Sequence, residues 1–447
     1  MIKDKDDKFR ELLEENPPLF QSRVDSPWQK DIPNISEYNK KAYRKIKRRL
    51  KSMEKNSQTQ GILILGEAGT GKTHLLMSIV RDLGHKHHVM FIRKPNNEDA
   101  VAQHIWTNIL ESLRKKISEN EKENQLDKLL SHVFTKILLK KFTEEVQEDK
   151  NIKRNEYWIN KLQESPQNIN IILGKAEVRN QRIPYLRRLI LTYLQKSHPD
   201  IDQTILRVLI SYYFVATDSH KRTLLTWLQG QQIETGAAKL AGLSELWVEI
   251  DDYSSNAAIR KQREEKAFRA IRCIGELASY YAPLVLAFDQ LEGFAEETLL
   301  SRRWGDAVRE IFTMTPNLLI ITCIFPSLWN DWFIKTLDQS VLDRISQIQV
   351  NLDTFEEKYA RSFLELHLQK SCELYNLPDK IFPFTEKDIK ILCEKTKTPR
   401  SFLKNAQQRF EDWLDDEEDV YDEAEEKNDS VIDQEAEVSE QTEVSKQ

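Results

Sequence analysis

The feature that most constrains this chain is the placement of its glycines. Only 12 of the 447 residues are glycine, whereas the usual share is about 7%. Even so, Gly61, Gly66, Gly69 and Gly71 fall within one window of eleven residues. Glycine permits backbone conformations with positive φ and lets the backbone approach another group closely. The clustering of glycine in a chain that otherwise contains little of it therefore indicates that the backbone in this window packs closely around another group.

The window contains GEAGTGKT at 66–73, between an apolar run at 61–65 and a helical pattern at 72–83. The spacing G-x-x-x-x-G-K-[ST] in this setting is typical of a loop whose backbone N–H groups wrap phosphates at the positive end of a helix. We expect Lys72 to reach the β- and γ-phosphates of ATP and the Thr73 hydroxyl to bind Mg²⁺. The predicted ATP-binding residues here are Gly66, Glu67, Ala68, Gly69, Thr70, Gly71, Lys72, Thr73 and His74.

A second Mg²⁺ ligand is predicted at Asp289, which follows the apolar run 284–288. Ligand sites in open parallel sheets lie at the carboxyl ends of the strands. ATPases with this loop place an acid there to hold the metal. An aspartate that simply ends a strand before a turn is the alternative. The sequence thus predicts a metal site formed by Thr73 and Asp289.

The hydrophobic pattern predicts an α/β fold. Short apolar runs at 61–65, 88–92, 283–288, 317–325 and 347–350 are typical of buried parallel strands. We expect a five-stranded parallel sheet with a large helical insertion and a C-terminal helical lid. The predicted parts are an N-terminal arm at 1–35, two segments of an ATPase core at 36–117 and 276–351, a helical insertion at 118–275, a lid at 352–414 and an acidic disordered tail at 415–447.

With these residues the chain resembles the AAA+ superfamily of P-loop ATPases, and within it the initiator-like and STAND-like branches. The resemblance covers roughly 35–118 and 275–414. In that superfamily a glutamate usually follows the magnesium aspartate and polarises the attacking water. Gln290 occupies that position here, and the nearest acid is Glu292. The resemblance therefore implies slow hydrolysis, with either Gln290 or Glu292 serving the water.

The resemblance implies three further site residues. Thr322, in the fourth strand, would sense the γ-phosphate, although threonine also simply suits a strand. Arg344, before the fifth strand, would be an arginine finger that reaches a neighbouring copy's nucleotide, since a planar cation suits phosphoryl charge; a structural salt bridge is the alternative. Arg400 would contact the phosphates from the lid, because Thr398 and Pro399 predict a helix start just before it.

Charge is distributed unevenly along the chain. The net charge is −6 overall but −13 over 415–447, so the remaining residues carry +7. Eight of the twelve residues at 40–51 are basic, which indicates either a solvated helix face or a contact with the phosphates of double-stranded DNA. The residues of that predicted contact are Lys40, Lys41, Arg44, Lys45, Lys47, Arg48, Arg49 and Lys51.

Other features narrow the setting. The four cysteines are scattered without a CxxC pair, so neither a zinc site nor a disulfide framework is expected. The first residues lack an apolar signal region and no run approaches the roughly 20 apolar residues of a membrane span. We therefore expect a cytoplasmic protein with no membrane partner.

Two functions remain open. The segment 224–245 is faintly similar to ATPases found beside bacterial anti-phage systems, including BREX accessory ATPases. One hypothesis is a self-associating ATPase that loads or remodels a partner on DNA, in bacterial DNA metabolism or phage defence. The other is a nucleotide-gated switch or scaffold that hydrolyses little and signals to an effector protein.

Overall fold

The computed structural model describes most of the chain, and its described residues are 3–415 without 19, 21–22, 30–31, 36, 166–167, 215–216, 232 and 241–255. They form two compact units. The sheet unit comprises 24–30 and 39–353, and the terminal helical unit comprises 1–23, 31–38 and the chain from 354 onward. The predicted tail lies outside the described residues from 416 on, as does part of the segment 224–245.

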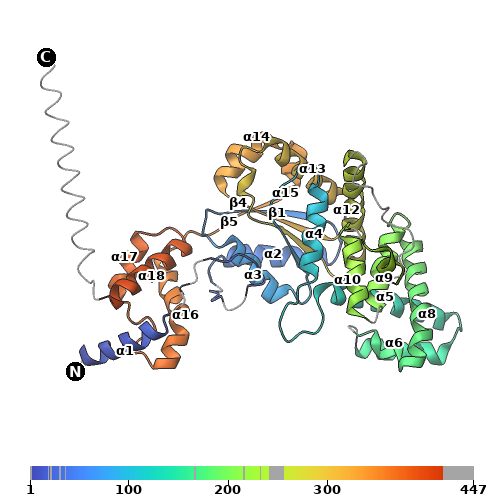
Figure 1. Cartoon of the computed structure of the whole chain (residues 1–447), viewed down its shortest axis with the longest axis horizontal. Helices are drawn as coiled ribbons and strands as arrows, with labels where there is room; N and C mark the ends of the chain where they lie inside the picture. Colours follow the sequence, from blue (N-terminus) through green and yellow to red (C-terminus); the bar gives the residue numbers. More distant parts are fainter. Residues whose placement is uncertain are drawn as a thin grey trace, which may run out of the picture. The chain divides into compact units, whose positions relative to one another are not determined.

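The sheet unit is built on five parallel strands in the order β2-β3-β4-β1-β5 (Figure 1). Every residue of β2, β3 and β4 is buried, because helices cover both faces of a parallel sheet and both sets of side chains are apolar. The predicted α/β fold with a five-stranded parallel sheet is confirmed. The strands are β1 (Gln60–Leu65), β2 (Val89–Ile92), β3 (Leu284–Phe288), β4 (Leu318–Ile324) and β5 (Ile348–Asn351).

The two faces of the sheet pack against different helices. One face, with Ile64 and Ile321, packs on α2 (Lys40–Met53) and α3 (Lys72–Leu83). The other face packs on a larger apolar core that includes α4, α12, α13 and α15. These helices are α4 (Val101–Leu113), α12 (Asn256–Ala278), α13 (Thr298–Met314) and α15 (Gln339–Ile345). The remaining short elements between β3 and β5 are η1 (Glu292–Phe294), η2 (Leu328–Phe333) and α14 (Ile334–Thr336).

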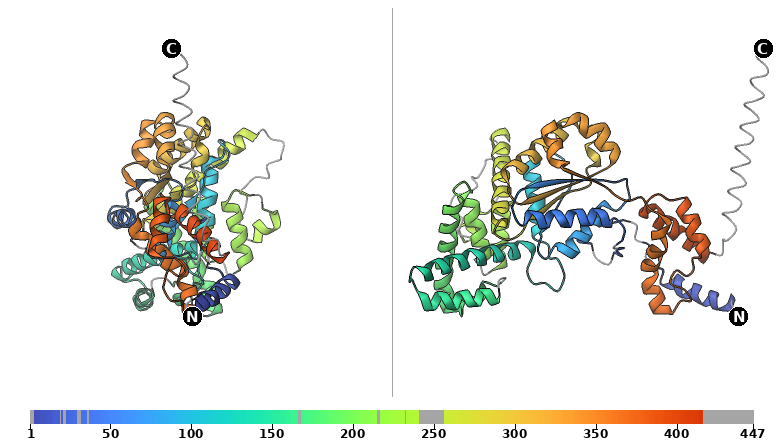
Figure 2. Two further views of the ribbon diagram at one scale, coloured as in Figure 1. Left: turned by 90° about the vertical axis from the view of Figure 1, so that its left-hand side faces the viewer. Right: turned by 180° about the vertical axis from the view of Figure 1, so that it is seen from behind.

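The helices inserted between β2 and β3 share their core with the sheet. Buried residues of α5 (Gln125–Gln147) and α9 (Gln203–Phe214) belong to the same apolar cluster as β3 and α13. The green helices of the insertion lie next to its last helix, α12, which packs on α4 (Figure 2). The contact clustering therefore places the whole insertion inside the sheet unit. Its helices are α5 (Gln125–Gln147), α6 (Ile152–Glu164), α7 (Asn170–Leu173), α8 (Ala176–Ser197), α9 (Gln203–Phe214), α10 (Asp218–Leu228), α11 (Thr235–Leu240) and α12.

The insertion is also bonded to the sheet's edge and to α4. Strand β2 is an edge strand, and its outward-facing amide at Val89 donates to the Gln125 side chain at 3.1 Å. The Glu264 carboxylate, on α12, accepts from the backbone N–H groups of Ala102 and Gln103, both at 2.8 Å. It thereby satisfies two of the donors left open at the start of α4. Polar side chains of the insertion thus complete both the sheet edge and a helix terminus.

A buried histidine lies just before β2 and makes the stability of the sheet unit sensitive to acid. His88 is fully buried, and burial lowers its pKa to about 3, with His132, Lys128 and His87 adding to the effect. An unfolded histidine titrates near 6.5. Between pH 6.5 and about 3, His88 is protonated in the unfolded chain but neutral in the folded one. The free energy of unfolding therefore keeps its full value above pH 6.5 and falls as the pH drops below it.

We expect His88→Phe to reduce this acid sensitivity by up to about 1.4 kcal/mol per pH unit between pH 6.5 and 4.5. The measurement is the free energy of urea unfolding at several pH values. The carboxylates titrate in both proteins, so the difference between them isolates His88. Equal slopes for His88→Phe and wild type would contradict the prediction.

The terminal helical unit joins the two ends of the chain. It contains α1 (Lys3–Glu15), α16 (Glu357–Tyr375), α17 (Glu386–Glu394) and α18 (Pro399–Leu414). Leu13 of α1 is fully buried in the same cluster as Phe402 and Phe410, and the Phe9 and Phe382 rings lie 5.6 Å apart. This division groups the expected parts differently, because residues 1–23 belong with the expected lid at 352–414 and the expected insertion at 118–275 belongs with the sheet. Apolar residues far apart in the sequence share a core in both places.

We expect Leu13→Ala to destabilise the terminal helical unit by about 2–5 kcal/mol, since it deletes a fully buried side chain. The measurement is thermal unfolding of the full chain, in which the transition of this unit should move to lower temperature. The exposed Glu11 on the same helix offers a control, and Glu11→Ala should shift the transition little. A Leu13→Ala protein with an unchanged transition would show that α1 does not belong to this core.

None of the helices in the described part of the chain is both long and apolar enough to span a bilayer.

Candidate nucleotide site

The glycine-rich loop connects the carboxyl end of β1 to the start of α3. Gly69 and Gly71 have φ values of 81° and 90°, a region that side chains with a Cβ rarely enter. A Cβ at Gly66 would meet the Thr70 hydroxyl oxygen at 2.5 Å. Gly71 is the N-cap of α3, which begins at Lys72. Glycine is therefore required at positions 69 and 71 by the left-handed backbone of the turn that leads into the N-terminus of α3.

The Lys72 ammonium is enclosed by the loop itself. Its Nζ donates to the backbone carbonyls of Gly66 at 2.8 Å and Glu67 at 3.2 Å, and it lies 4.1 Å from the centre of the Phe325 ring. Lys72 is only 7% exposed. Burial lowers its pKa, and the carboxylates of Asp289, Glu292 and Glu67 oppose that shift. A cation held in a desolvated position by uncharged carbonyl acceptors is well suited to exchange them for phosphate oxygens, because hydrogen bonds between two charged groups are stronger.

Thr73 and Asp289 meet at the carboxyl ends of the strands. The Thr73 hydroxyl donates to a carboxylate oxygen of Asp289 at 2.5 Å. Asp289 is 1% exposed, and burial raises its pKa, against the stabilising bonds from Thr73 and the Gln290 N–H and the charge of Lys72. One hydroxyl and one carboxylate, both oxygen donors, are ligands that Mg²⁺ accepts from proteins alongside substrate phosphates. These two residues therefore fit the metal.

A known protein-family model matches part of the sheet unit. Residues 39–149 match the family model described as the NB-ARC domain. The matched segment begins one residue before α2 and contains the loop, α3, β2 and α4. It occupies about a quarter of the chain and is joined in space to the strand that supplies Asp289. The fold is that of a P-loop NTPase. No curated protein and no solved structure matches the chain.

The chain reverses sharply after Asp289. Gln290 has a φ of 59°, a left-handed conformation that is uncommon outside glycine. The 3₁₀ turn at Glu292–Phe294 follows, anchored by the buried Phe294. The Glu292 carboxylate returns close enough to act electrostatically on Lys72, Asp289 and Cys323. The turn therefore brings Glu292 back toward the loop, although it stands three residues after Asp289.

Thr322 does not face the loop. Strand β4 runs on to Ile324, and its residues alternate between faces: Ile320 and Ile324 belong to the core on the α4 side, and Cys323 to the core on the α3 side. Thr322 therefore lies on the face away from α3, fully buried. Its hydroxyl has no hydrogen-bond partner among the described residues. The expectation that this threonine senses the γ-phosphate is not supported by the direction of its side chain.

Cys323 is the residue of β4 that faces the site. Asp289 and Lys72 both act on its thiol, whose pKa is raised by burial above its usual range. The sequence alone did not indicate this residue, because the pairing of β3 with β4 that identifies it is seen only in the structure. Phe288 pairs with Thr322 in the register of β3 and β4, so the next residue on each strand, Asp289 and Cys323, points to the opposite face.

Arg344 lies at the far end of the sheet from the loop. Its backbone carbonyl contacts Gly61, near the start of β1, and Gly66 lies five positions further along the chain, roughly 16 Å at 3.3 Å per residue. The guanidinium donates to the Ser340 carbonyl at 2.6 Å and lies 5.9 Å from the Phe312 ring centre. The structure thus keeps Arg344 away from its own chain's loop, so a role in hydrolysis requires a neighbouring copy.

The remaining predicted residues divide between the two units. Glu67 and Ala68 are exposed on the rim of the loop, and His74 is half-buried on α3. Arg400 is exposed in the first turn of α18, after the N-cap Thr398, whose hydroxyl accepts from the Ser401 N–H. Arg400 belongs to the terminal helical unit, so its role toward the nucleotide stays a prediction.

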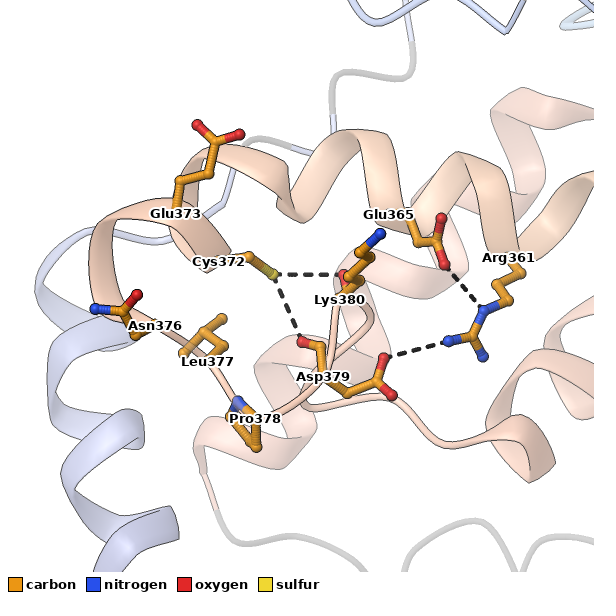
Figure 3. A pocket seen from close by; sticks show the side chains of 9 residues that line it. All are labelled: Arg361, Glu365, Cys372, Glu373, Asn376, Leu377, Pro378, Asp379 and Lys380. Atoms are coloured by element: carbon orange, nitrogen blue, oxygen red, sulfur yellow. Dashed lines mark hydrogen bonds and ion pairs between the residues drawn. The ribbon is translucent and has the colours of Figure 1, made fainter.

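A separate hollow lies in the terminal helical unit, between α16 and the segment that follows it (Figure 3). Arg361 in this hollow bonds to Glu365 at 2.9 Å and to Asp379 at 3.3 Å. The Cys372 thiol donates to the backbone carbonyls of Asp379 and Lys380. Arg361, Glu365 and Asp379 of the hollow thus pair with one another, and we assign the hollow no ligand.

Proposed function

We propose that the chain is a STAND-type switch that binds ATP with Mg²⁺ and hydrolyses it slowly. The observation that supports this most directly is the Thr73–Asp289 contact, with Lys72 enclosed beside it. When bound, Mg²⁺ would neutralise phosphate charge next to these oxygens. Lys72 would hold the β- and γ-phosphates, and the N–H groups of 66–74 would surround them. Glu292 would accept a proton from the attacking water, with Gln290 orienting that water.

Slow turnover follows from the acid's position. In this proposal Glu292 approaches the site through the turn at Gln290 and is only partly buried. A base reaching in from a short surface turn is held less firmly than one at the end of a strand, and a small misplacement costs much of the rate. We therefore expect turnover well below the typical enzyme median of about 10 per second.

Steady-state ATP hydrolysis at several protein concentrations tests this proposal. Tight ATP binding with a slow rate that does not depend on protein concentration supports a switch that acts on an effector protein. A rate that rises steeply with concentration supports self-association in which Arg344 reaches a neighbouring copy's nucleotide. Absence of ATP binding with Mg²⁺ present contradicts both, and would remove the proposed roles of Arg344 and Arg400 at the same time.

A second proposal concerns double-stranded DNA, and the exposed face of α2 favours it. Ala42, Ile46, Leu50 and Met53 bury one side of this helix, so the basic residues gather on the other. The exposed ones are Lys41, Arg44, Lys45, Lys47, Arg48 and Lys51. A row of cations on one helix face is the electrostatic footprint of a phosphate backbone.

The basic face continues into a hollow of about 360 Å³ beside the ends of α2 and α3. Lys47, Lys51 and Lys86 line it. Its two acids are already paired, since Glu54 bonds to Lys86 at 2.7 Å and Asp82 bonds to Arg81 at 2.7 Å. These pairings leave the lysines of α2 as the charges that face outward, which suits an anionic partner.

Replacing Arg44, Lys47 and Arg48 by glutamine should weaken duplex DNA binding and lower the slope of log K against log salt by about 2–3, since each lost phosphate contact contributes about 0.9. The measurement is a fluorescence-anisotropy titration at four salt concentrations. Lys387 and Lys390, exposed on α17, provide a control pair whose replacement should change neither value. An unchanged slope in the triple variant, or no binding by the wild type, would overturn the DNA proposal.

The biological setting is also a proposal. The faint likeness of 224–245 to ATPases beside anti-phage systems supports a role in bacterial phage defence, and the basic face of α2 supports one in DNA metabolism. Either setting would place the protein in the cytoplasm. An effector protein that binds the wild type in the presence of ATP, but does not bind a Lys72 variant, would favour the switch.

A further inference from the structure

Asn39 has an unusual position in the sheet unit. It is the first residue of that unit after the crossing at 38/39 and stands immediately before α2. Its φ is 57° and only 4% of it is exposed. Asparagine often caps a helix with its side chain, but that of Asn39 makes no capping bond to α2. Because buried polar groups are normally hydrogen-bonded, we look for the partners of the Asn39 side chain outside α2.

The side-chain amide of Asn39 bridges two segments far apart in the sequence. Its Nδ2 donates to the backbone carbonyl of Thr70 at 3.0 Å, and its Oδ1 accepts from the backbone N–H of Asp353 at 2.9 Å. A carbonyl only accepts and an N–H only donates. The orientation of the amide is therefore determined by its partners, and no flipped amide could make both bonds.

The two partners are a loop residue and the last residue of the unit. Thr70 lies inside the glycine-rich loop, and Asp353 is where the chain leaves the sheet unit at 353/354. The preceding residue, Leu352, donates its N–H to the carbonyl of Leu65 at 2.8 Å. The exit segment is thus bonded to the end of β1 and, through Asn39, to the loop that follows β1.

The carbonyl that Asn39 holds cannot move independently of the loop's phosphate-binding groups. The Thr70 carbonyl and the Gly71 N–H belong to one planar peptide unit. If the Gly71 N–H turns toward a phosphate, the Thr70 carbonyl must rotate with it, and its bond to Asn39 lengthens or breaks. The hydrogen bond that the Asn39 side chain accepts from the Asp353 N–H then changes as well.

We propose that Asn39 is a positioning residue that couples the conformation of the loop to two of the chain crossings between the units, those at 38/39 and 353/354. This inference rests on the proposed nucleotide function. The ligand that drives the coupling is the phosphate chain of a nucleoside triphosphate or diphosphate. A change in the conformation of the loop is thereby transmitted to these two crossings.

Two substitutions separate the two bonds. Asn39→Asp has the same shape and keeps an acceptor for the Asp353 N–H, but it offers no donor to Thr70. Asn39→Gly tolerates the left-handed conformation and removes both bonds. Asn151 is a matched control, because it also has a left-handed φ, of 51°, and precedes a helix, α6, without a side-chain capping bond.

Hydrogen exchange measured by mass spectrometry on the full chain, with and without ATP and Mg²⁺, tests the coupling. Without nucleotide, Asn39→Gly should speed exchange at least tenfold in peptides containing Asp353, whereas Asn39→Asp should not. In the wild type, nucleotide should change exchange at least threefold both in the loop and at Asp353. In Asn39→Asp the loop should still respond and Asp353 should not. Asn151→Gly should behave as the wild type throughout.

The outcomes distinguish this inference from the proposed function. A response at Asp353 that survives in Asn39→Asp, or a wild type whose loop responds while Asp353 does not, overturns the coupling. A purely structural role would change exchange by the same factor with and without nucleotide, which also overturns it. If nucleotide fails to protect the wild-type loop, the proposed function fails. The bridge itself is then judged without nucleotide, where equal exchange at Asp353 in Asn39→Gly and wild type would refute it.

Discussion

Replacing Lys72 by alanine is expected to lower the affinity for ATP by at least 10- to 100-fold and to abolish turnover. The ammonium would otherwise make charge-assisted bonds to the phosphates, each contributing about 1.5–3 kcal/mol. Its present partners are backbone carbonyls of Gly66 and Glu67 and the Phe325 ring, none of which can replace it. The measurement is titration with a fluorescent ATP analogue, followed by steady-state hydrolysis.

Folding must be separated from binding in this variant. Lys72→Met keeps the aliphatic stem against Phe325 and removes a charge that burial disfavours. We therefore expect it to lose binding as Lys72→Ala does while keeping the urea midpoint of the wild type. Lys55, exposed just after α2, is the control, and Lys55→Ala should bind normally. Normal ATP affinity in both Lys72 variants would refute the site.

The second large effect is expected at Glu292. Glu292→Gln should reduce the rate of hydrolysis by at least 100-fold, because removal of a general base typically costs 10²–10⁴ in rate. ATP affinity should change less than threefold, since the residue would act on water and not on the phosphates. Single-turnover hydrolysis at saturating ATP separates these two quantities.

Glu296 provides the matched control for this experiment. It lies in the same turn, is exposed and has a φ of 71°, so Glu296→Gln changes one charge without changing backbone preference. Its rate should stay within twofold of the wild type. If Glu292→Gln also keeps the wild-type rate, the base is elsewhere, and Gln290→Ala becomes the test of whether that amide orients the water.

Much of the site was predictable because its chemistry is local. The loop, Lys72 and Thr73 form one continuous segment whose glycines, lysine and threonine have fixed spacing, so a short pattern contains the whole geometry. Strands such as β3 were predictable for a similar reason. A parallel strand buried on both faces is an uninterrupted apolar run, and Asp289 stands out as the polar residue that ends it.

Residues that depend on the direction of a side chain were harder to predict. The choice between Thr322 and Cys323 depends on which face of β4 meets α3, and a uniformly apolar run such as LLIITCI does not reveal its two faces. Gln290 shows the same limit. Only its left-handed φ brings Glu292 back toward Asp289, and that conformation has no marker in a glutamine.

The amino-acid sequence by itself determined the α/β fold, the glycine-rich loop and the acid that ends the third strand, since each is encoded within a few consecutive residues. Only the tertiary structure decided that α1 shares a core with α16–α18, that the insertion completes the edge of the sheet through Gln125, and that Asn39 joins Thr70 to Asp353. Those contacts link residues tens to hundreds of positions apart. Their existence depends on how packed surfaces meet in space, which no local pattern of residue types specifies.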